Sequence, residues 1–125
     1  MSIDRAIKII EGTITTARER EPPTQFSGII EYEGKRHEVM HTGSNPITAM
    51  SNAINHVTGK SYAVRYWQHE GFMNECIPEK KQIGTAEVVL ADSDGDTYRG
   101  RAQGDWSDVC MMQAVVDAYN NRQQQ

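Results

Sequence analysis

The spacing of hydrophobic residues changes along the chain, from strand-like alternation to a helical period. The pattern of Phe26–Glu33 and the alternation in Lys35–Thr42 predict two strands, with Glu33-Gly34 as the turn of a β-hairpin. The apolar residues that follow recur at the spacing of one helix face. They are Ile47, Met50, Ala53, Ile54 and Val57. The first half of the chain is therefore expected to form a hairpin followed by a helix.

The junction between this hairpin and its helix carries capping residues. Gly43 ends the second strand, Asn45 is suited to cap the helix, and Pro46 suits its first position. Proline loses nothing there, because its missing N–H group would have no partner within the helix. Gly59 is expected to end the helix in a left-handed conformation.

The second half of the chain follows the same order. Ser61–His69, Gly84–Ala91 and Thr97–Gln103 are predicted strands, and the acidic turn Asp92–Asp96 joins the last two. The segment Gly71–Lys81 is expected to be a long loop. A second helix is expected to follow, with an apolar stripe of Val109, Met112, Val115, Val116 and Tyr119.

Matching residues in the two halves are separated by a constant 61 positions. Gly34 matches Gly95, and Gly43 matches Gly104 at the start of each helical segment. The further matches are Met50 with Met111, Ala53 with Ala114, Ile54 with Val115, and Glu31 and Glu33 with Asp92 and Asp94. The match needs no gap and predicts a duplicated unit.

The N-terminal residues allow two interpretations. Ile3–Glu11 has the apolar spacing of a helix, whereas Ala6–Thr16 is rich in β-branched residues and suits a strand. Residues 1–25 are therefore assigned to an N-terminal helix or strand and a linker, and residues 26–125 to the tandem-repeat domain. With a strand at the N-terminus each unit reads βββα. This order predicts an α+β fold with two antiparallel sheets, each covered by one helix.

The composition disfavours several classes of protein. A chain of 125 residues corresponds to one domain, and no apolar run approaches the roughly 18 residues needed to cross a bilayer. The net charge of −4 argues against a nucleic-acid-binding surface. The first residues lack the features of a signal peptide, and Cys76 and Cys110 form no CxxC pair. We expect a cytoplasmic protein with reduced cysteines and with neither nucleic-acid nor membrane partners.

The sequence carries no recognisable catalytic or metal-binding set. Asp92–Asp96 begins like a calcium loop, but Gln103 stands at its twelfth position, where an EF-hand has glutamate. The histidines lack the close spacing of metal ligands and have no cysteine partner. They are His37, His41, His56 and His69. No catalytic residue, metal or cofactor is therefore expected.

The two turn-to-helix junctions are the best candidates for ligand binding. A helix N-terminus presents free N–H groups and a positive dipole end, so the junction at Gly43–Asn45 suits a carboxylate. The matching junction at Asp105–Asp108 is acidic and suits an ammonium group. Together they suit a zwitterion such as an amino acid, although ordinary helix capping explains the same residues.

Longer motifs around these junctions resemble a known family. The motifs are Gly43-Ser-Asn-Pro-Ile-Thr-Ala-Met-Ser-Asn-Ala-Ile, Val64-Arg-Tyr-Trp-Gln-His-Glu, Tyr98-Arg-Gly-Arg-Ala-Gln-Gly, Ser107-Asp-Val and Gln113-Ala-Val-Val-Asp-Ala-Tyr-Asn. From about Phe26 to Asn121 the chain is similar to the C-terminal regulatory domain of 2-isopropylmalate synthase, citramalate synthase and homocitrate synthase. Two positions depart from the family's pattern. Asn45 stands where glycine is usual, and Glu70 stands where a small residue is common.

The resemblance implies a duplicated βββα domain that dimerises and binds a feedback inhibitor near the subunit interface. That inhibitor is leucine in 2-isopropylmalate synthases and can be isoleucine in citramalate synthases. The residues at positions that match the family's site are Asn45, Pro46, Ile47, Ala49, Tyr66, Glu70, Ser107 and Asp108. The printed sequence holds no counterpart of the family's catalytic barrel. The resemblance therefore implies a non-catalytic, homodimeric regulator of branched-chain amino-acid biosynthesis that acts with a catalytic synthase.

Other function classes remain open at the level of sequence. The chain could be a dimerisation or protein-interaction module of the same fold that has lost its ligand. A hairpin and a helix also build small RNA-binding domains, although the acidic charge disfavours that class. A small enzyme would need a cleft of perturbed carboxylates, which the sequence does not indicate.

Overall fold

The computed structural model describes residues 7–73, 82–105 and 108–123, which form six strands and two helices. In chain order the elements are β1 (Lys8–Thr16), β2 (Thr24–Tyr32), β3 (Lys35–Gly43), α1 (Pro46–Thr58), β4 (Ala63–Met73), β5 (Gln82–Ala91), β6 (Thr97–Asp105) and α2 (Asp108–Gln123). The order β-β-β-α therefore occurs twice along the chain.

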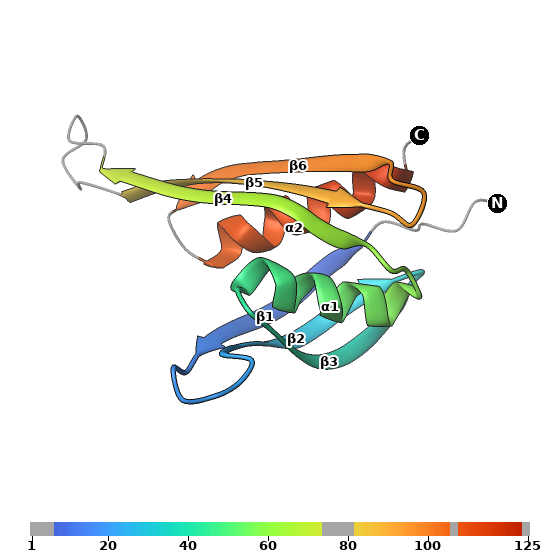
Figure 1. The fold of residues 1–125 in the computed structure, drawn as a ribbon, viewed down its shortest axis with the longest axis horizontal. Coiled ribbons are helices and arrows are strands. Elements are labelled where there is room, and N and C mark those ends of the chain that lie inside the picture. The colour runs from blue at the N-terminus through green and yellow to red at the C-terminus, as the bar shows by residue number, and fades with distance from the viewer. Residues whose placement is uncertain (1–6, 74–81, 106–107, 124–125) are drawn as a thin grey trace.

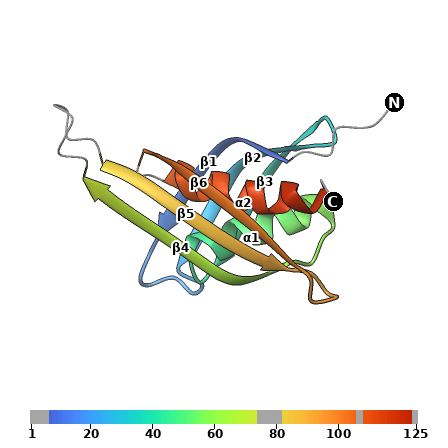
Figure 2. The same ribbon diagram turned by 90° about the horizontal axis from the view of Figure 1, so that it is seen from above.

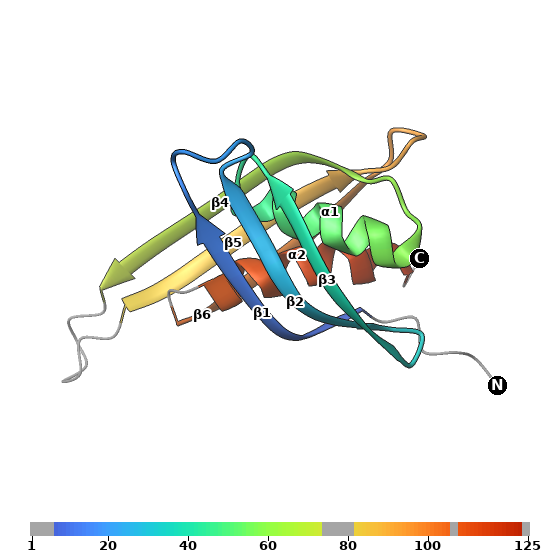
Figure 3. The same ribbon diagram turned by 90° about the horizontal axis from the view of Figure 1, so that it is seen from below.

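The strands of each βββα unit form an antiparallel sheet of three strands, and the two sheets enclose both helices. The first sheet has the order β1-β2-β3, and the second has the order β4-β5-β6. Figure 1 shows the helices in the middle layer, with one sheet above them and the other below. Figure 2 and Figure 3 show that the strands of one sheet run across the direction of the other sheet's strands. Helix α1 packs mainly on β3 and β2, and α2 mainly on β6 and β5.

This arrangement confirms the predicted α+β fold of two βββα units, with antiparallel sheets each covered by one helix. The N-terminal alternative is decided in favour of a strand, because β1 pairs with β2 along its length from Lys8 to Thr16. The helical interpretation is therefore wrong over residues 8–11, while residues 1–6 lie outside the described part of the chain. The first unit begins at β1, and the segment 17–23 joins that strand to β2.

The two units do not match at one constant separation, contrary to the prediction. Gly28 pairs with Val39 in the first sheet, and Val88 pairs with Gly100 at the matching place in the second. Strands β2 and β5 therefore match at a separation of 60 residues, whereas β3 and β6 match at 61. Four residues separate Glu31 from its partner Arg36 in the first hairpin, whereas five separate Ala91 from Thr97 in the second, and this extra residue accounts for the difference.

A β-bulge lies at the same place in both sheets and fixes this alignment. The bulged residue is Ile10 in β1 and Arg65 in β4, and it follows the pair made with Ile30 and Leu90, respectively. Ile30 and Leu90 are both 0% exposed. The duplication therefore extends to the first strands, which match at a separation of 55 residues.

The first helix has the ends that its sequence predicts. Asn45 is the N-cap, and its side-chain oxygen accepts a hydrogen bond from the Thr48 N–H group at 2.9 Å. Pro46 is the first helical residue, and Gly59 closes the helix in the left-handed region with φ of 73°. These residues satisfy or remove backbone groups that the helix itself leaves unpaired.

One hydrophobic core fills the space between the sheets. Its fully buried side chains include Phe26, Ile30, Ile47, Met50, Ile54, Val88, Leu90, Val115 and Tyr119. Helix α2 approaches its sheet closely at Gly100, where an added Cβ would lie 2.0 Å from the Ala114 carbonyl oxygen. Val39 holds the matching place in β3. In the second unit the backbones of α2 and β6 therefore lie against each other at this place, whereas the first unit has the Val39 side chain there.

Two asparagines connect the helices to the residue that precedes the first strand of the opposite unit. Asn120 in α2 accepts from the Ile7 N–H group at 2.8 Å and donates to the Ile7 carbonyl at 3.2 Å. Asn55 in α1 accepts from the Tyr62 N–H group at 3.3 Å and donates to the Tyr62 carbonyl at 2.9 Å. Ile7 precedes β1 and Tyr62 precedes β4, at matching places. The two units are therefore joined by a reciprocal pair of side-chain contacts.

Candidate functional site

The first turn-to-helix junction runs from the end of β3 into α1 and is closely packed. An added Cβ at Gly43 would lie 2.6 Å from the Ala49 backbone nitrogen, so glycine is needed for this approach. The Asn45 side chain accepts from the Thr48 N–H group, and the Asn45 carbonyl accepts from the Ala49 N–H group at 3.0 Å. Two donors of the first helical turn are therefore bonded within the chain.

The apolar residues that the resemblance assigns to this junction lie in the core. Ile47 is 1% exposed and Ala49 is 0% exposed. Asn45 and Pro46 are half-buried and keep part of their surface accessible. A ligand at this junction would therefore contact Asn45, Pro46 and the backbone, and not the side chains of Ile47 and Ala49.

The second turn-to-helix junction lies only partly within the described residues. Strand β6 ends at Asp105 and α2 begins at Asp108. The predicted ligand residue Ser107 falls outside the described part, and Asp108 is placed only as the first residue of α2. The prediction for these two side chains stays a prediction.

Tyr66 and Glu70 lie on β4, on the face of the second sheet that points away from the helices. Tyr66 pairs with Val89, which alternates along β5 with the buried Val88. The Tyr66 hydroxyl donates to the Gln68 amide oxygen at 2.5 Å, and the Gln68 amide donates to the Glu70 carboxylate. The three side chains therefore form one exposed polar row, which we call the β4 row.

The predicted ligand residues thus fall into two groups within one chain. Asn45 and Pro46 lie at the start of α1, in the layer between the sheets. Tyr66 and Glu70 lie on the outer face of the second sheet, so that sheet stands between the two groups. A single chain does not bring them together into one site.

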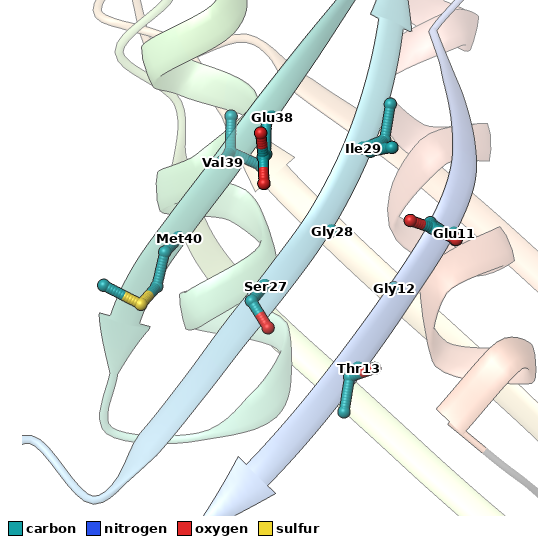
Figure 4. Close-up of a pocket in the computed structure, with 9 residues that line it drawn as sticks. All are labelled: Glu11, Gly12, Thr13, Ser27, Gly28, Ile29, Glu38, Val39 and Met40. Atoms are coloured by element: carbon teal, nitrogen blue, oxygen red, sulfur yellow. The ribbon is translucent and has the colours of Figure 1, made fainter.

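Shallow hollows lie over the outer faces of both sheets. The hollow over the first sheet measures about 560 Å³, and Figure 4 shows Glu11 and Glu38 within it, with Ile29 on the strand between them. The hollow over the second sheet measures about 450 Å³. An ion pair crosses it, in which Arg101 Nε donates to the Glu87 carboxylate at 2.7 Å. Both hollows are open surfaces and lack the enclosure typical of small-molecule sites.

A buried polar network joins the two helices, and the sequence pattern did not predict it. The Tyr119 hydroxyl donates to Asn55 Oδ1 at 2.7 Å and lies 2.8 Å from Ser51 Oγ. Burial raises the pKa of Tyr119 far above its usual range, although the Ser51 hydrogen bond acts in the opposite direction. The hydroxyl therefore remains a neutral donor. Ser51 and Asn55, four residues apart along a mostly apolar helix face, are the sequence signal for such a network.

His41 on β3 and His56 on α1 form a ring pair where the first helix packs on its sheet. Their ring centroids are 5.0 Å apart and the rings are tilted. Burial lowers the pKa of His41 below 6.5, and the neighbouring His56 lowers it further. The neutral form of His41 is therefore favoured in the folded protein.

Replacing His41 with glutamine is expected to flatten the pH dependence of stability. Because the pKa of His41 is lowered by folding, the unfolded chain binds this proton more readily. The free energy of unfolding of the wild type therefore falls as the pH drops below about 6.5. Urea unfolding between about pH 5 and pH 8 measures the slope. His37→Gln, on the same strand and face, is the control, and an equal loss of slope in that variant would contradict the assignment to His41.

The remaining reactive groups give no further site. Across residues 7–73, 82–105 and 108–123 no group of three or more His, Cys, Asp or Glu side chains could hold a metal ion. The Cys110 thiol is 2% exposed, and burial raises its pKa, which makes it a poor nucleophile. In the same residues no helix has the length and apolar character required to cross a bilayer.

Comparison with known proteins gives no assignment. No protein-family model matches this chain, and no curated protein is significantly similar to it in sequence. The interpretation of the site therefore depends on its geometry and on the resemblance of its motifs.

Proposed function

We propose that this chain is a non-catalytic regulatory domain that forms a homodimer and binds a branched-chain amino acid such as leucine. In this proposal it relays the binding of the amino acid to a catalytic partner of the 2-isopropylmalate synthase type. The supporting observation is the duplicated βββα architecture, with both helices enclosed between the sheets. This is the fold that the resemblance implies. Because a fold alone does not determine a function, the accessible residues must supply the binding chemistry.

Two groups of residues supply that chemistry in the proposal. Asn45 and Pro46 lie at the accessible start of a 13-residue helix, where the helix dipole favours a carboxylate. Tyr66 and Glu70 offer a hydroxyl and a carboxylate, which suit an ammonium group. They lie apart within one chain, so the proposal places the ligand at the contact between two copies. Binding there would favour one arrangement of the dimer over another, which is the requirement for a regulatory signal.

Titration with L-leucine, L-isoleucine and L-valine is expected to give heat and to raise the midpoint of thermal unfolding. D-Leucine is the matched control, because it has the same composition and charge. Asn45→Gly places the family's usual residue at the N-cap and costs only roughly a few tenths of a kcal/mol, so this variant is expected to fold and to bind. Absence of heat and of any thermal shift with all three amino acids at millimolar concentration would overturn the ligand part of the proposal.

A second candidate function is an interaction module of the same fold without a ligand. The bonded N–H groups of Thr48 and Ala49 and the burial of Ile47 favour it, because they leave less of the first junction free. This candidate predicts a dimer whose stability does not change with amino acid. Sedimentation equilibrium with and without L-leucine separates the two functions.

A further inference from the structure

The helices protect one edge of each sheet against pairing with another strand. On β3, the Asn52 side chain of α1 donates to the Thr42 carbonyl at 2.9 Å. On β6, the Arg101 N–H group donates to the Asp117 carboxylate of α2 at 3.0 Å. These contacts use edge groups that another strand would need for pairing. The third strand of each sheet is therefore a poor interface.

The opposite edge of the second sheet is β4, and it carries two exposed aromatic side chains. Tyr66 is 47% exposed on the outer face, and Trp67 is 38% exposed on the other face, where it pairs with Val88. Exposed aromatic residues on both faces of an edge strand are typical of a contact surface. At the matching places on β1 the chain has Glu11 and Gly12. The first strands of the two units, β1 and β4, therefore differ in their suitability for an interface, although they hold matching places.

We propose that β4 forms the contact between two copies of this chain, pairing antiparallel with the same strand of the partner around a twofold axis at Gln68. The two second sheets then form one continuous sheet of six strands. This inference rests on the homodimer of the proposed function and names the surface that forms it. A strand edge offers a row of backbone donors and acceptors, and a twofold axis across that edge makes identical strands run antiparallel.

The length and the sequence of β4 favour this register. Gln68 is the middle residue of β4, so an axis there centres the pairing on the strand, with the regular stretch Tyr66–Glu70 at its middle. It places Tyr66 opposite the partner's Glu70 and Trp67 opposite the partner's His69. Cross-strand pairs of this kind stabilise a sheet, whereas an axis at Glu70 would set two carboxylates against each other.

The pairing also brings the β4 rows of the two copies together. The row of Tyr66, Gln68 and Glu70 lies on the outer face, and the axis passes through its middle residue. Two copies of the row then adjoin each other on one surface, with two hydroxyls and two carboxylates around the axis. The rows of the two copies therefore become one symmetric polar patch on the outer face of the dimer.

Cysteine cross-linking tests the position of the axis. In a Cys76→Ser background, Gln68→Cys is expected to form a disulfide-linked dimer under mild oxidation, because a residue on the axis lies within disulfide reach of its own copy. Cys110 can be retained because it is buried. Thr13 holds the place of Gln68 on β1, so Thr13→Cys is the matched control and is expected to stay monomeric on a non-reducing gel.

A second variant tests the contact without introducing a new bond. Trp67→Lys is expected to weaken dimerisation by about tenfold or more in sedimentation equilibrium, with an unchanged circular dichroism spectrum. If the wild type dimerises but Gln68→Cys links no better than Thr13→Cys, the interface is overturned and the proposed function stands. If the wild type binds leucine as a monomer, the interface and the dimeric part of the function are both overturned. Absence of leucine binding in a dimer that cross-links through Gln68→Cys would leave the interface intact and overturn only the ligand.

Discussion

Gly100→Ala is expected to lower the free energy of unfolding by about 3 kcal/mol or more, at the upper end of the range for an overpacked core. An added Cβ would lie 2.0 Å from the Ala114 carbonyl oxygen and 2.3 Å from the Ala118 nitrogen. Both are backbone atoms of α2, so no change of rotamer can relieve the overlap. The helix must move away from β6 and loosen the core. Urea unfolding followed by circular dichroism measures the loss.

Gly59→Asn is the matched control for this substitution. Gly59 has φ of 73° and nothing within 4 Å of an added Cβ, so a larger side chain meets no obstacle there. Asparagine tolerates the left-handed conformation, and the expected loss is below about 1 kcal/mol. A Gly100→Ala variant as stable as Gly59→Asn would show that α2 does not lie against β6 as closely as the structure has it.

Much of the architecture could be predicted from the sequence because its signals are local. Asn45, Pro46 and Gly59 mark both ends of α1. Gly34 and Gly95 mark the two hairpin turns, where φ is 77° and 89°. Each position has a backbone requirement that few residue types meet, so the residue type alone locates the boundary.

The constant register of the repeat was wrong because its matches lie on both sides of an inserted residue. Gly34 and Gly43 align with their counterparts at 61 residues, but both lie at or after the first turn. Before the turn, Glu31 is matched with Asp92 in the sequence because both residues are acidic. The strand pairing of the structure matches Glu31 with Ala91 instead. A shift of one residue moves every side chain of a strand to the other face, so burial is needed to detect it.

The candidate site could be predicted only in part, because its geometry depends on features without a local signal. The bulge at Arg65 reverses the alternation of β4, and it thereby places Tyr66 and Glu70 on the outer face. No glycine or proline marks this bulge in the sequence. Similarly, the hydrogen bond between Ser51 and Tyr119 joins residues 68 positions apart, which no periodicity reveals.

Tyr119→Phe is expected to lower the free energy of unfolding by about 2 kcal/mol, although it removes a single oxygen atom. The hydroxyl is buried at the contact between the helices, where it bonds to both Ser51 and Asn55. Without it, the 2%-exposed Ser51 loses its partner across the helix contact and has no access to water in exchange. The loss is therefore larger than the net value of a hydrogen bond at an exposed site. Thermal and urea unfolding of the variant measure it.

A double-mutant cycle with Ser51→Ala separates this network from simple packing. If the two hydroxyls are bonded in the folded protein, removing the second after the first relieves an unpaired group, so the double variant is expected to be more stable than additivity predicts by about 1 kcal/mol. Asn55 keeps its bonds to the Tyr62 backbone in every variant, so the anchor of β4 is unchanged. Strict additivity would contradict the Ser51–Tyr119 bond and would leave the hydrogen bond from Tyr119 to Asn55 as the polar link between α1 and α2 at this point.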